Sequence, residues 1–487
     1  MNMGDPPAGV AETHSAVVFF VGDRAYKVKK PVDLGFLDFR TREQREVVCH
    51  REVELNRRLA PDVYLGVADL VGPDGQPWDH VVVMRRMPTD RRLSTLARSG
   101  ADVDDDVRAV ARLVAAFHAR AERSDDTDGA GTRDAVAANW EANIAEMAGF
   151  VGTRLPEETA GQVAGLARGY LAGRRELFEH RIRGGRVRDG HGDLLADDVF
   201  CLADGPRVLD CLEFDDRLRY GDVLLDAAFL AMDLERLGRG DLGTRFLDWW
   251  GEYSGESHPA SLADHYIAYR AQVRAKVACL RAEQGDPIAA EEARQLLDLC
   301  RRHLEHARIR LVVVGGLPGT GKSTVATGLA ERVGMILLRS DEVRKELAGI
   351  NAGERAGAPY REGIYGPEHT VRTYDALLQR ASTALGLGES VVIDASWTDQ
   401  RWRKRAAELA AATSSELVEL RCDVPADEAA RRIVARTDAG NDVSDATPEV
   451  AAAMASATDP WPSATTVDTS GSPDAALSAA LAAVLDR

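Results

Sequence analysis

Residues 311–324 read LVVVGGLPGTGKST, an apolar run followed by a glycine-rich loop and a lysine–serine pair. Glycines at this spacing let backbone N–H groups converge on phosphate oxygens, while the lysine reaches the β- and γ-phosphates and the serine hydroxyl binds Mg²⁺. A chance match in an Ala/Gly-rich sequence is the alternative, but a strand pattern precedes the loop and a helix pattern follows it at 324–332, as the motif requires. The sequence therefore predicts a site for ATP and Mg²⁺. The expected contact residues are Gly316, Leu317, Pro318, Gly319, Thr320, Gly321, Lys322, Ser323 and Thr324.

Composition limits the partners of the chain. Its 487 residues suit two to four domains of about 150 residues each. The formal net charge of −17 opposes attraction to nucleic acid or to an anionic membrane. A local basic groove is compatible with this charge, which only weighs against a nucleic-acid substrate. We expect a small-molecule partner that carries a hydroxyl group.

The sequence predicts neither export nor membrane insertion. The longest apolar runs, such as 17–21 and 311–314, are far shorter than the roughly 20 residues of a membrane span. The first fifteen residues lack the basic-then-apolar order of a signal peptide. Six cysteines without C-x-x-C spacing are typical of free thiols in a reducing compartment. We therefore expect a cytoplasmic protein.

The second half of the chain alternates strand and helix patterns. Strands are expected at 311–315, 335–339, 391–394 and 416–422. The alternation predicts an α/β fold, a parallel sheet with helices on both faces. The Ala/Ser-rich stretch 446–486 is expected to form a lid and a terminal helix.

The first half begins with strand patterns and continues as helices, an α+β arrangement. We expect a hairpin at 16–30, a helix at 41–59, a strand at 81–84, helices over 102–183 with a polar loop at 121–133, short strands near 199–201 and 207–211, and helices at 221–237, 260–283 and 287–307. The predicted domains are residues 1–305, with a small lobe at 10–88 and a large lobe at 89–305, and residues 306–487.

Two carboxylates of the second half follow predicted strands. Asp394 ends the apolar run 391–393, the Walker B position that holds Mg²⁺ indirectly, through another ligand or a water molecule. Asp341 follows the strand 335–339 at the edge where ligands collect in open α/β sheets. Asp341 is therefore the candidate proton acceptor for a substrate hydroxyl, with Arg344 nearby to balance charge. The alternative role for Asp341 is to cap the helix at 342–348, and both roles can coexist.

Three arginines follow in the segment AARRIVAR. Helical spacing places Arg432 and Arg436 on one face, where a lid would bring them onto the transferring phosphoryl group. The alternative for these two residues and for Arg431 is a solvated helix face.

The motifs GGLPGTGKST, RSDEVRKELAG, VVIDASW and RRIVAR give residues 311–460 a resemblance to small bacterial P-loop kinases, the group that includes gluconate kinase, chloramphenicol phosphotransferase and zeta-toxin-like proteins. The resemblance implies that Asp341 is the general base. It does not name the substrate, because these kinases phosphorylate hydroxyls of diverse small molecules.

The first half contains a second set of chemical residues. His191-Gly192-Asp193 matches an H-G-D catalytic-loop motif, in which the aspartate, here Asp193, orients or accepts the hydroxyl proton. In this motif the residue five positions later, here Asp198, holds Mg²⁺. Lys27 lies on a predicted strand and suits the α- and β-phosphates, with Lys29 as the alternative on the same face.

Three more carboxylates complete this set in chain order. Glu52 lies on the inward face of the 41–59 helix, where a lysine–glutamate pair would form. Asp210 follows the strand near 207–209, at the position of a second metal ligand, and Asp226 is placed to brace the catalytic loop. Each of these residues, taken alone, is equally consistent with an exposed charged side chain. Only their order along the chain indicates a site.

Residues 10–300 resemble the aminoglycoside phosphotransferase-like kinase superfamily. Together with segments such as ETHSAVVFFVGDRAYKVKKPV and LEFDDRLRYGDVLLDAAFLAMDL, the whole chain resembles a bacterial two-domain family that fuses this kinase-like fold to a P-loop kinase. Two departures stand out: Asp198 replaces the usual metal-binding Asn, and no G-x-G-x-x-G loop occurs near 13–23. Asp remains a competent Mg²⁺ ligand.

The sequence thus predicts an enzyme that uses ATP and Mg²⁺ to phosphorylate a hydroxyl of a small polar metabolite, sugar-like or antibiotic-like, with the second half as the better supported site. One alternative is a nucleotide-gated regulatory protein whose first domain binds ligand without turnover, which Asp198 favours and Asp193 and Asp210 oppose. Phosphorylation of RNA or nucleotide 5′ ends is a third alternative, and the net charge argues against it.

Overall fold

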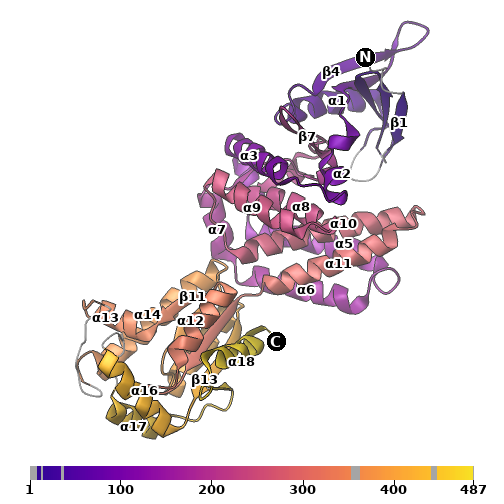
Figure 1. Cartoon of the computed structure of the whole chain (residues 1–487). Helices are drawn as coiled ribbons and strands as arrows, with labels where there is room; N and C mark the ends of the chain where they lie inside the picture. Colours follow the sequence, from indigo (N-terminus) through magenta and orange to yellow (C-terminus); the bar gives the residue numbers. More distant parts are fainter. Residues whose placement is uncertain (1–7, 13–14, 34–37, 352–361, 440–446, 486–487) are drawn as a thin grey trace. The chain divides into compact units, whose positions relative to one another are not determined.

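The computed structural model describes residues 8–12, 15–33, 38–351, 362–439 and 447–485, and Figure 1 shows the order of its elements. The chain divides into two compact units. The first comprises Met1–Ala164, Phe178–His258 and Ala263–Leu304, and the second comprises Gly165–Leu177, Pro259–Leu262 and Glu305–Arg487. The domain limits expected from the sequence, 1–305 and 306–487, stay a prediction. No helix among the described residues is long and apolar enough to cross a membrane.

The first unit opens with an antiparallel sheet of order β1-β2-β3-β5-β4. Its strands are β1 (Gly9–Glu12), β2 (Ala16–Val21), β3 (Arg24–Lys29), β4 (Tyr64–Val71) and β5 (Pro77–Arg85). The helix α1 (Arg42–Asn56) connects β3 to β4 and begins at a capping box formed by Thr41 and Gln44. Its residues Cys49 and Val53 join Ala25, Val82 and Met84 in one buried cluster. This is the small lobe of a protein-kinase-like fold.

The large lobe is mainly helical. Its helices are α2 (Leu93–Arg98), α3 (Asp104–Arg120), α4 (Asp125–Ala130), α5 (Arg133–Met147), α6 (Glu157–Ala172), α7 (Arg175–Arg183), α8 (Val223–Arg236), α9 (Gly240–Ser254), α10 (Ala260–Glu283) and α11 (Ala289–His306). The expected polar loop at 121–133 was wrong, because Ser124 and Thr127 form a capping box that starts α4 inside it.

Two short antiparallel pairs carry the loops of the large lobe. One joins β6 (Val187–Asp189) to β9 (Tyr220–Asp222), and the other joins β7 (Val199–Leu202) to β8 (Gly205–Val208). The H-G-D segment lies between β6 and β7, and Asp210 follows β8. The candidate residues of the first unit therefore lie on connections between short strands.

A half-buried ion cluster joins three helices of the large lobe. His303 on α11 lies 2.6 Å from Asp264 of α10 through Nδ1 and 2.8 Å from Glu235 of α8 through Nε2. Burial alone would lower the pKa of His303, but the hydrogen bonds to the two carboxylates outweigh it and raise that pKa to about 9. The imidazolium form therefore holds α8, α10 and α11 together.

We expect His303→Gln to destabilise the first unit in a pH-dependent way. The pKa of His303 is higher in the folded protein than in the unfolded chain, so protonation of His303 adds to the free energy of unfolding. This contribution is complete below the unfolded-state pKa of about 6.5 and is lost as the pH rises through about 9. The loss should be up to about 3 kcal/mol below pH 6.5. Scanning calorimetry should show a Tm difference between parent and variant that shrinks above pH 9, and an equal difference at both ends would contradict the assignment.

The second unit contains a parallel sheet of order β11-β12-β10-β13-β14. Its strands are β10 (Arg310–Gly315), β11 (Ile336–Arg339), β12 (Val391–Asp394), β13 (Glu416–Asp423) and β14 (Thr465–Asp468). The central β10 is fully buried and leads directly into the glycine-rich loop. This is the P-loop NTPase fold. The strand β14 corrects the expectation of only a lid and a terminal helix over 446–486.

Helices cover the sheet of the second unit. They are α12 (Lys322–Val333), α13 (Ser340–Leu347), α14 (Pro367–Gly386), α15 (Gln400–Ala412), α16 (Ala426–Ala439), α17 (Pro448–Ser456) and α18 (Pro473–Leu485). Leu329 of α12 and Val484 of α18 are buried in one cluster with Val312 and Val314 of β10. Because the carboxyl ends of parallel strands share one edge, the sheet brings the residues after β10, β11 and β12 together.

Candidate functional site

The glycine-rich loop of the second unit has the backbone that a phosphate-binding loop requires. Gly316, Gly319 and Gly321 have φ values of 149°, 83° and 79°. A Cβ at Gly319 would lie 2.5 Å from the carbonyl oxygen of Ala429, so only glycine fits there. Gly321 is the N-cap of α12 and offers no side-chain cap, which leaves the first N–H groups of the helix for an anion.

Neighbouring segments hold this loop in place. The Thr320 hydroxyl donates to the carbonyl of Leu317 at 2.8 Å, and the Thr469 hydroxyl donates to the carbonyl of Thr320 at 2.7 Å. Thr469 follows β14, whose existence the sequence pattern did not predict. The loop is therefore fixed before any ligand binds.

The Walker B carboxylate is buried beside the loop and incompletely paired. Asp394 is only 4% exposed, and its Oδ1 finds no hydrogen-bond partner within the described part of the chain. Its Oδ2 lies 3.5 Å from Nε of Arg339 on the adjacent β11. A buried carboxylate oxygen without a partner is costly unless a ligand satisfies it. Together with the Ser323 hydroxyl, these hard oxygens suit Mg²⁺.

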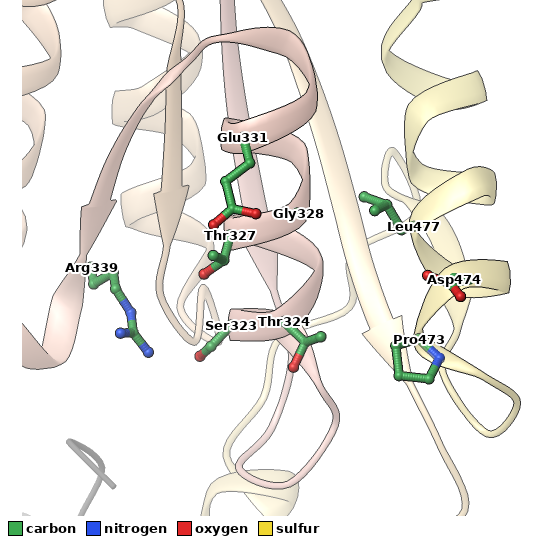
Figure 2. Close-up of a pocket in the computed structure, with 9 residues that line it drawn as sticks. All are labelled: Ser323, Thr324, Thr327, Gly328, Glu331, Arg339, Pro473, Asp474 and Leu477. Atoms are coloured by element: carbon green, nitrogen blue, oxygen red, sulfur yellow. The ribbon is translucent and has the colours of Figure 1, made fainter.

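An open groove of about 470 Å³ runs from the start of α12 toward α18 (Figure 2). Six of its nine lining residues have polar side chains. The lining residues are Ser323, Thr324, Thr327, Gly328, Glu331, Arg339, Pro473, Asp474 and Leu477. The groove thus connects the predicted metal ligand Ser323 with solvent.

The structure places Asp341 inside a helix and not at its cap. The helix α13 begins at Ser340, its N-cap is Arg339, and that cap makes no side-chain hydrogen bond. Asp341 is therefore in the first turn, where a carboxylate interacts favourably with the helix dipole, and it is half-buried. The N-cap alternative for Asp341 is wrong.

Arg344 is fixed on the same helix. Its Nη1 donates to the carbonyl of Ile364 at 2.9 Å and to the Thr370 hydroxyl at 3.2 Å. The guanidinium carbon lies 5.2 Å from the ring centroid of Tyr365, and the residue is 8% exposed. Arg344 is thus a preorganised cation close in sequence to Asp341.

The arginines of α16 already have partners. Arg432 pairs with Glu428 at 2.9 Å and donates to the carbonyl of Thr469 at 2.9 Å, beside the phosphate loop. Arg431 is exposed and also pairs with Glu428, as expected for a solvated face. The side chain of Arg436 lies outside the described residues.

The first unit brings its predicted residues together across the two lobes. Nζ of Lys27 lies 2.8 Å from Glu52 of α1 and 2.6 Å from Asp210 of the large lobe. Lys29 pairs with the other oxygen of Glu52 at 2.6 Å and with Glu213. The side chain of Lys29 is 1% exposed and that of Lys27 is 11% exposed, so Lys27 is the more accessible of the two lysines.

Asp210 lies in a strained backbone conformation next to Lys27. Its φ is 63°, which is rare for a residue with a side chain. The Lys27 ammonium outweighs the effect of burial and lowers the pKa of Asp210 to about 2. Its backbone N–H donates to the hydroxyl of Tyr64 at 3.1 Å. Asp210 is therefore held as a carboxylate, the form that binds a metal ion.

Carboxylates of α8 hold the loop that contains the H-G-D segment. The two oxygens of Asp226 accept from the backbone N–H groups of His191 at 2.7 Å and Gly192 at 2.9 Å. Although burial opposes it, a hydrogen bond from His118 at 3.0 Å helps to hold the pKa of Asp226 well below its usual range. Further along α8, Asp233 accepts from the N–H of Ala196 at 2.9 Å.

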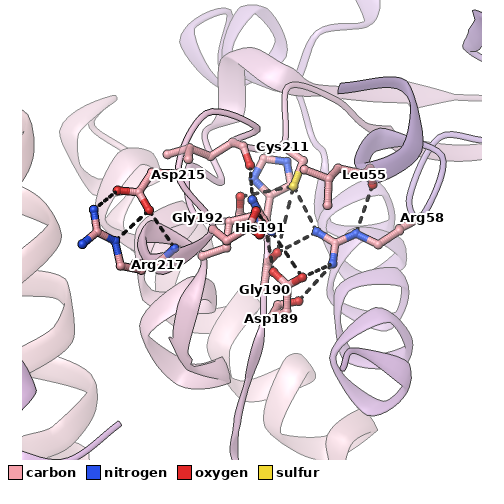
Figure 3. A network of polar contacts seen from close by, with 12 residues as sticks. Leu55, Arg58, Asp189, Gly190, His191, Gly192, Cys211, Asp215 and Arg217 are labelled. Atoms are coloured by element: carbon pink, nitrogen blue, oxygen red, sulfur yellow. Dashed lines mark hydrogen bonds and ion pairs between the residues drawn. The ribbon is translucent and has the colours of Figure 1, made fainter. Parts of the chain in front are cut away.

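Arg58, just after α1, ties the small lobe to the same loop (Figure 3). It donates to the carbonyls of Asp189 at 3.1 Å and Gly190 at 2.9 Å and contacts the sulfur of Cys211 at 3.1 Å. Sequence reasoning missed Arg58 and Glu213. The sequence carries no signal for either residue, because their partners are distant in the chain.

The carboxylates of Asp193, Asp198 and Asp210 lie around the H-G-D loop, and the cations nearby do not neutralise all three negative charges. Burial raises the pKa of Asp193 to about 6, and nearby Arg274 partly offsets the rise. Burial raises the pKa of Asp198 well above its usual range, and the charges of Asp210 and Asp193 raise it further. Such a cluster fits divalent cations, which Asp198 and Asp210 would hold.

Comparisons with known proteins found similarities for both halves of the chain. A family model described as an AAA domain matches residues 311–461. Among solved structures, a choline/ethanolamine kinase family protein from Mesorhizobium loti is similar at 16% identity and TM-score 0.40, covering 62% of this chain and 90% of that one. The GDP complex of aminoglycoside 2′-phosphotransferase-IIIa is similar at 16% identity and TM-score 0.36, covering 62% and 94%. A gluconokinase from Sinorhizobium meliloti is similar at 19% identity and TM-score 0.27, covering 37% and 92%.

Relatives span nearly the whole chain. The uncharacterized protein Rv2004c of Mycobacterium tuberculosis strain H37Rv is 47% identical over 469 residues, which cover 96% of this chain and 93% of the relative. The uncharacterized protein Mb2027c of Mycobacterium bovis has the same identity and coverage. The fold assignment itself rests on the strand orders and connections described above. The chain belongs to the family of these mycobacterial proteins.

Proposed function

We propose that the protein is an ATP-dependent phosphotransferase that transfers the γ-phosphoryl group to a hydroxyl of a small polar metabolite, with the P-loop site as its principal centre. The observation that carries this proposal is the unpartnered Oδ1 of buried Asp394 next to the preformed phosphate loop. Such an oxygen is expected where a metal–nucleotide complex binds.

Each residue of the P-loop site has a defined task. The N–H groups of the loop and of the first turn of α12 bind the phosphates, and Lys322 neutralises charge that grows on the γ-phosphoryl group. Ser323 and Asp394 would hold Mg²⁺, which neutralises phosphate charge when bound. The acceptor oxygen bonds to the γ-phosphorus as the bond to the bridging oxygen of ADP breaks, and the hydroxyl proton passes to Asp341.

Asp341 suits this task because it follows β11, the strand two positions from β10 in the sheet. The carboxyl ends of these parallel strands meet at one edge, so an acceptor bound there lies between Asp341 and the phosphate loop. Arg344, three residues further along α13, would bind an anionic part of the reacting groups.

The first unit supports a second phosphoryl-transfer site of the same kind. The Lys27–Glu52 pair is formed, Asp210 is ionised, and Asp193 has the raised pKa that a general base requires. A ligand-binding domain without turnover remains the competing hypothesis, because Asp198 takes the place of the usual Asn. Full-length variants that silence one site at a time distinguish these hypotheses.

We expect Asp341→Asn to lower phosphoryl transfer by about 10²-fold or more while MgATP affinity stays near that of the parent. The reason is that the amide cannot accept the proton, whereas the phosphate contacts do not involve Asp341. ATP consumption would be measured with pooled sugars and polyols, in a full-length chain whose first site carries Asp193→Asn.

The matched control is Glu346→Gln, which changes an exposed carboxylate of the same helix that pairs with Arg380. This control should retain activity. If Asp341→Asn lowered only the Tm and kept the turnover per folded molecule, Asp341 would have a structural role and no catalytic one.

A further inference from the structure

Two arginines of α10 lie near the catalytic loop of the first unit and lack anionic partners. Arg270 is 8% exposed; its Nε donates to the carbonyl of Leu225 at 3.3 Å, and its guanidinium carbon lies 4.5 Å from the ring centroid of Phe229. Among the described residues, its terminal nitrogens make no hydrogen bond or ion pair. A largely buried guanidinium group whose terminal donors have no protein partner is suited to bind an anion.

Arg274 lies one helical turn further along α10 and is half-buried. The helix α10 contacts the start of α8, where Tyr266 donates to Asp222 and Arg270 donates to the carbonyl of Leu225, and further along Arg236 of α8 and Arg281 of α10 both pair with Glu292. Arg274 is therefore level with the part of α8 that leads to Asp233, which holds the catalytic loop. Over the ranges that the structure describes, Arg274 also makes no hydrogen bond or ion pair.

The carboxylates nearest to these arginines along α8 are already engaged. Asp226 binds His118 and two backbone N–H groups of the catalytic loop, and Asp233 binds Arg236 and the N–H of Ala196. In a chain with a net charge of −17, two adjacent guanidinium groups without a carboxylate partner are unexpected. Burial raises the pKa of Asp193, and the positive charges of Arg274 and Arg270 oppose this rise.

We propose that Arg270 and Arg274 form an anion-binding subsite that holds a negatively charged group, a carboxylate or a phosphate, of the hydroxyl acceptor beside Asp193. The proposal deepens the function proposed for the first unit and rests on it. An acceptor bound in this way presents a hydroxyl to Asp193 and its anionic group to the arginines, which form strong charge-assisted bonds to such groups. A cationic acceptor, such as an amino sugar, would be repelled.

The first test is sulfate binding to the full-length protein, measured by calorimetry at constant ionic strength. Arg270→Gln and Arg274→Gln should each weaken one sulfate site about 10-fold or more, because each removes charged donors. Sulfate sites elsewhere, including the phosphate loop, are common to all variants and cancel in the comparison. Arg274→Lys should retain part of the affinity.

The matched control is Arg112→Gln on α3, because Arg112 also has no hydrogen bond or ion pair in the described chain but is exposed. It should leave every sulfate site unchanged. If the two α10 variants bind sulfate as the parent does while their thermal unfolding shows that they are folded, the anion-binding subsite does not exist.

The second test uses a metabolite extract separated by charge into anionic, neutral and cationic pools. With Lys322→Ala silencing the P-loop site, ATP consumption should require the anionic pool and fall about 10-fold or more in Arg274→Gln. Consumption supported by the cationic pool alone would overturn the proposed acceptor class. If no pool supported consumption, the phosphotransferase function of the first unit would fail, whereas sulfate binding would still decide the anion subsite.

Discussion

Lys322→Ala should abolish nucleotide turnover at the P-loop site and leave the fold intact. Lys322 is the first residue of α12 and follows the three glycines whose backbone shapes the loop. Its ammonium group neutralises charge on the β- and γ-phosphates, and that charge increases in the transition state. Preorganised groups of this kind are worth several kcal/mol, so a loss of about 10²- to 10³-fold or more is expected.

The measurement is ATP turnover by the full-length chain in which Asp193→Asn silences the first unit. The matched control is Lys404→Ala, which removes a highly exposed lysine of α15 in the same unit. The control should turn over ATP at the parent rate. Turnover unchanged by Lys322→Ala, with Tm also unchanged, would refute the assignment of the phosphate loop.

Asp210→Ala should remove metal-dependent nucleotide binding from the first unit. Asp210 is ionised next to Lys27, whereas Asp198 is half-buried near two other carboxylates. Because three carboxylates repel one another, divalent cations should be needed before ATP binds well. Asp198→Asn should relax this metal dependence, since it removes one of the charges.

Calorimetry with ATP in the Lys322→Ala chain, with and without Mg²⁺ or Mn²⁺, measures this effect. The matched control is Asp204→Ala, which removes an exposed carboxylate paired with Arg207 in the turn between β7 and β8. It should bind MgATP normally. If the Lys322→Ala chain bound no nucleotide at millimolar Mg²⁺, the first unit would be a ligand sensor or a relic, and the P-loop unit alone would be the enzyme.

The sequence predicts local features of this fold well, and long-range partners poorly. The phosphate loop, its helix and β12 were predictable because glycine spacing and apolar runs are local signals. The helix α4 was not, because its start depends on a capping box of Ser124 and Thr127 within an otherwise polar segment. The strand β14 was missed because it is four residues long and only one of them is buried.

The residues of the candidate sites were likewise predictable from the sequence, whereas their long-range partners were not. The order of Lys27, Glu52 and Asp210 along the chain indicated a joint site, and the structure brings Glu52 and Asp210 each within 3 Å of Nζ of Lys27. The choice between Lys27 and Lys29 was not predictable, because it depends on Glu213, which reaches Lys29 from the other lobe. The unpaired state of Arg270 and Arg274 is likewise a property of the packed helices, and no pattern in the sequence reports it.

The transfer of label from γ-³²P-ATP to small molecules of a metabolite extract tests the central claim most directly. The full-length parent, the Lys322→Ala chain, the Asp193→Asn chain and the double variant would be compared at equal folded concentration. We predict that the parent labels a small molecule, that Lys322→Ala removes most of this label and that the double variant transfers none. A double variant that labels the same molecule at the parent rate, or a parent that binds MgATP and transfers no label to any molecule, would contradict a phosphotransferase function.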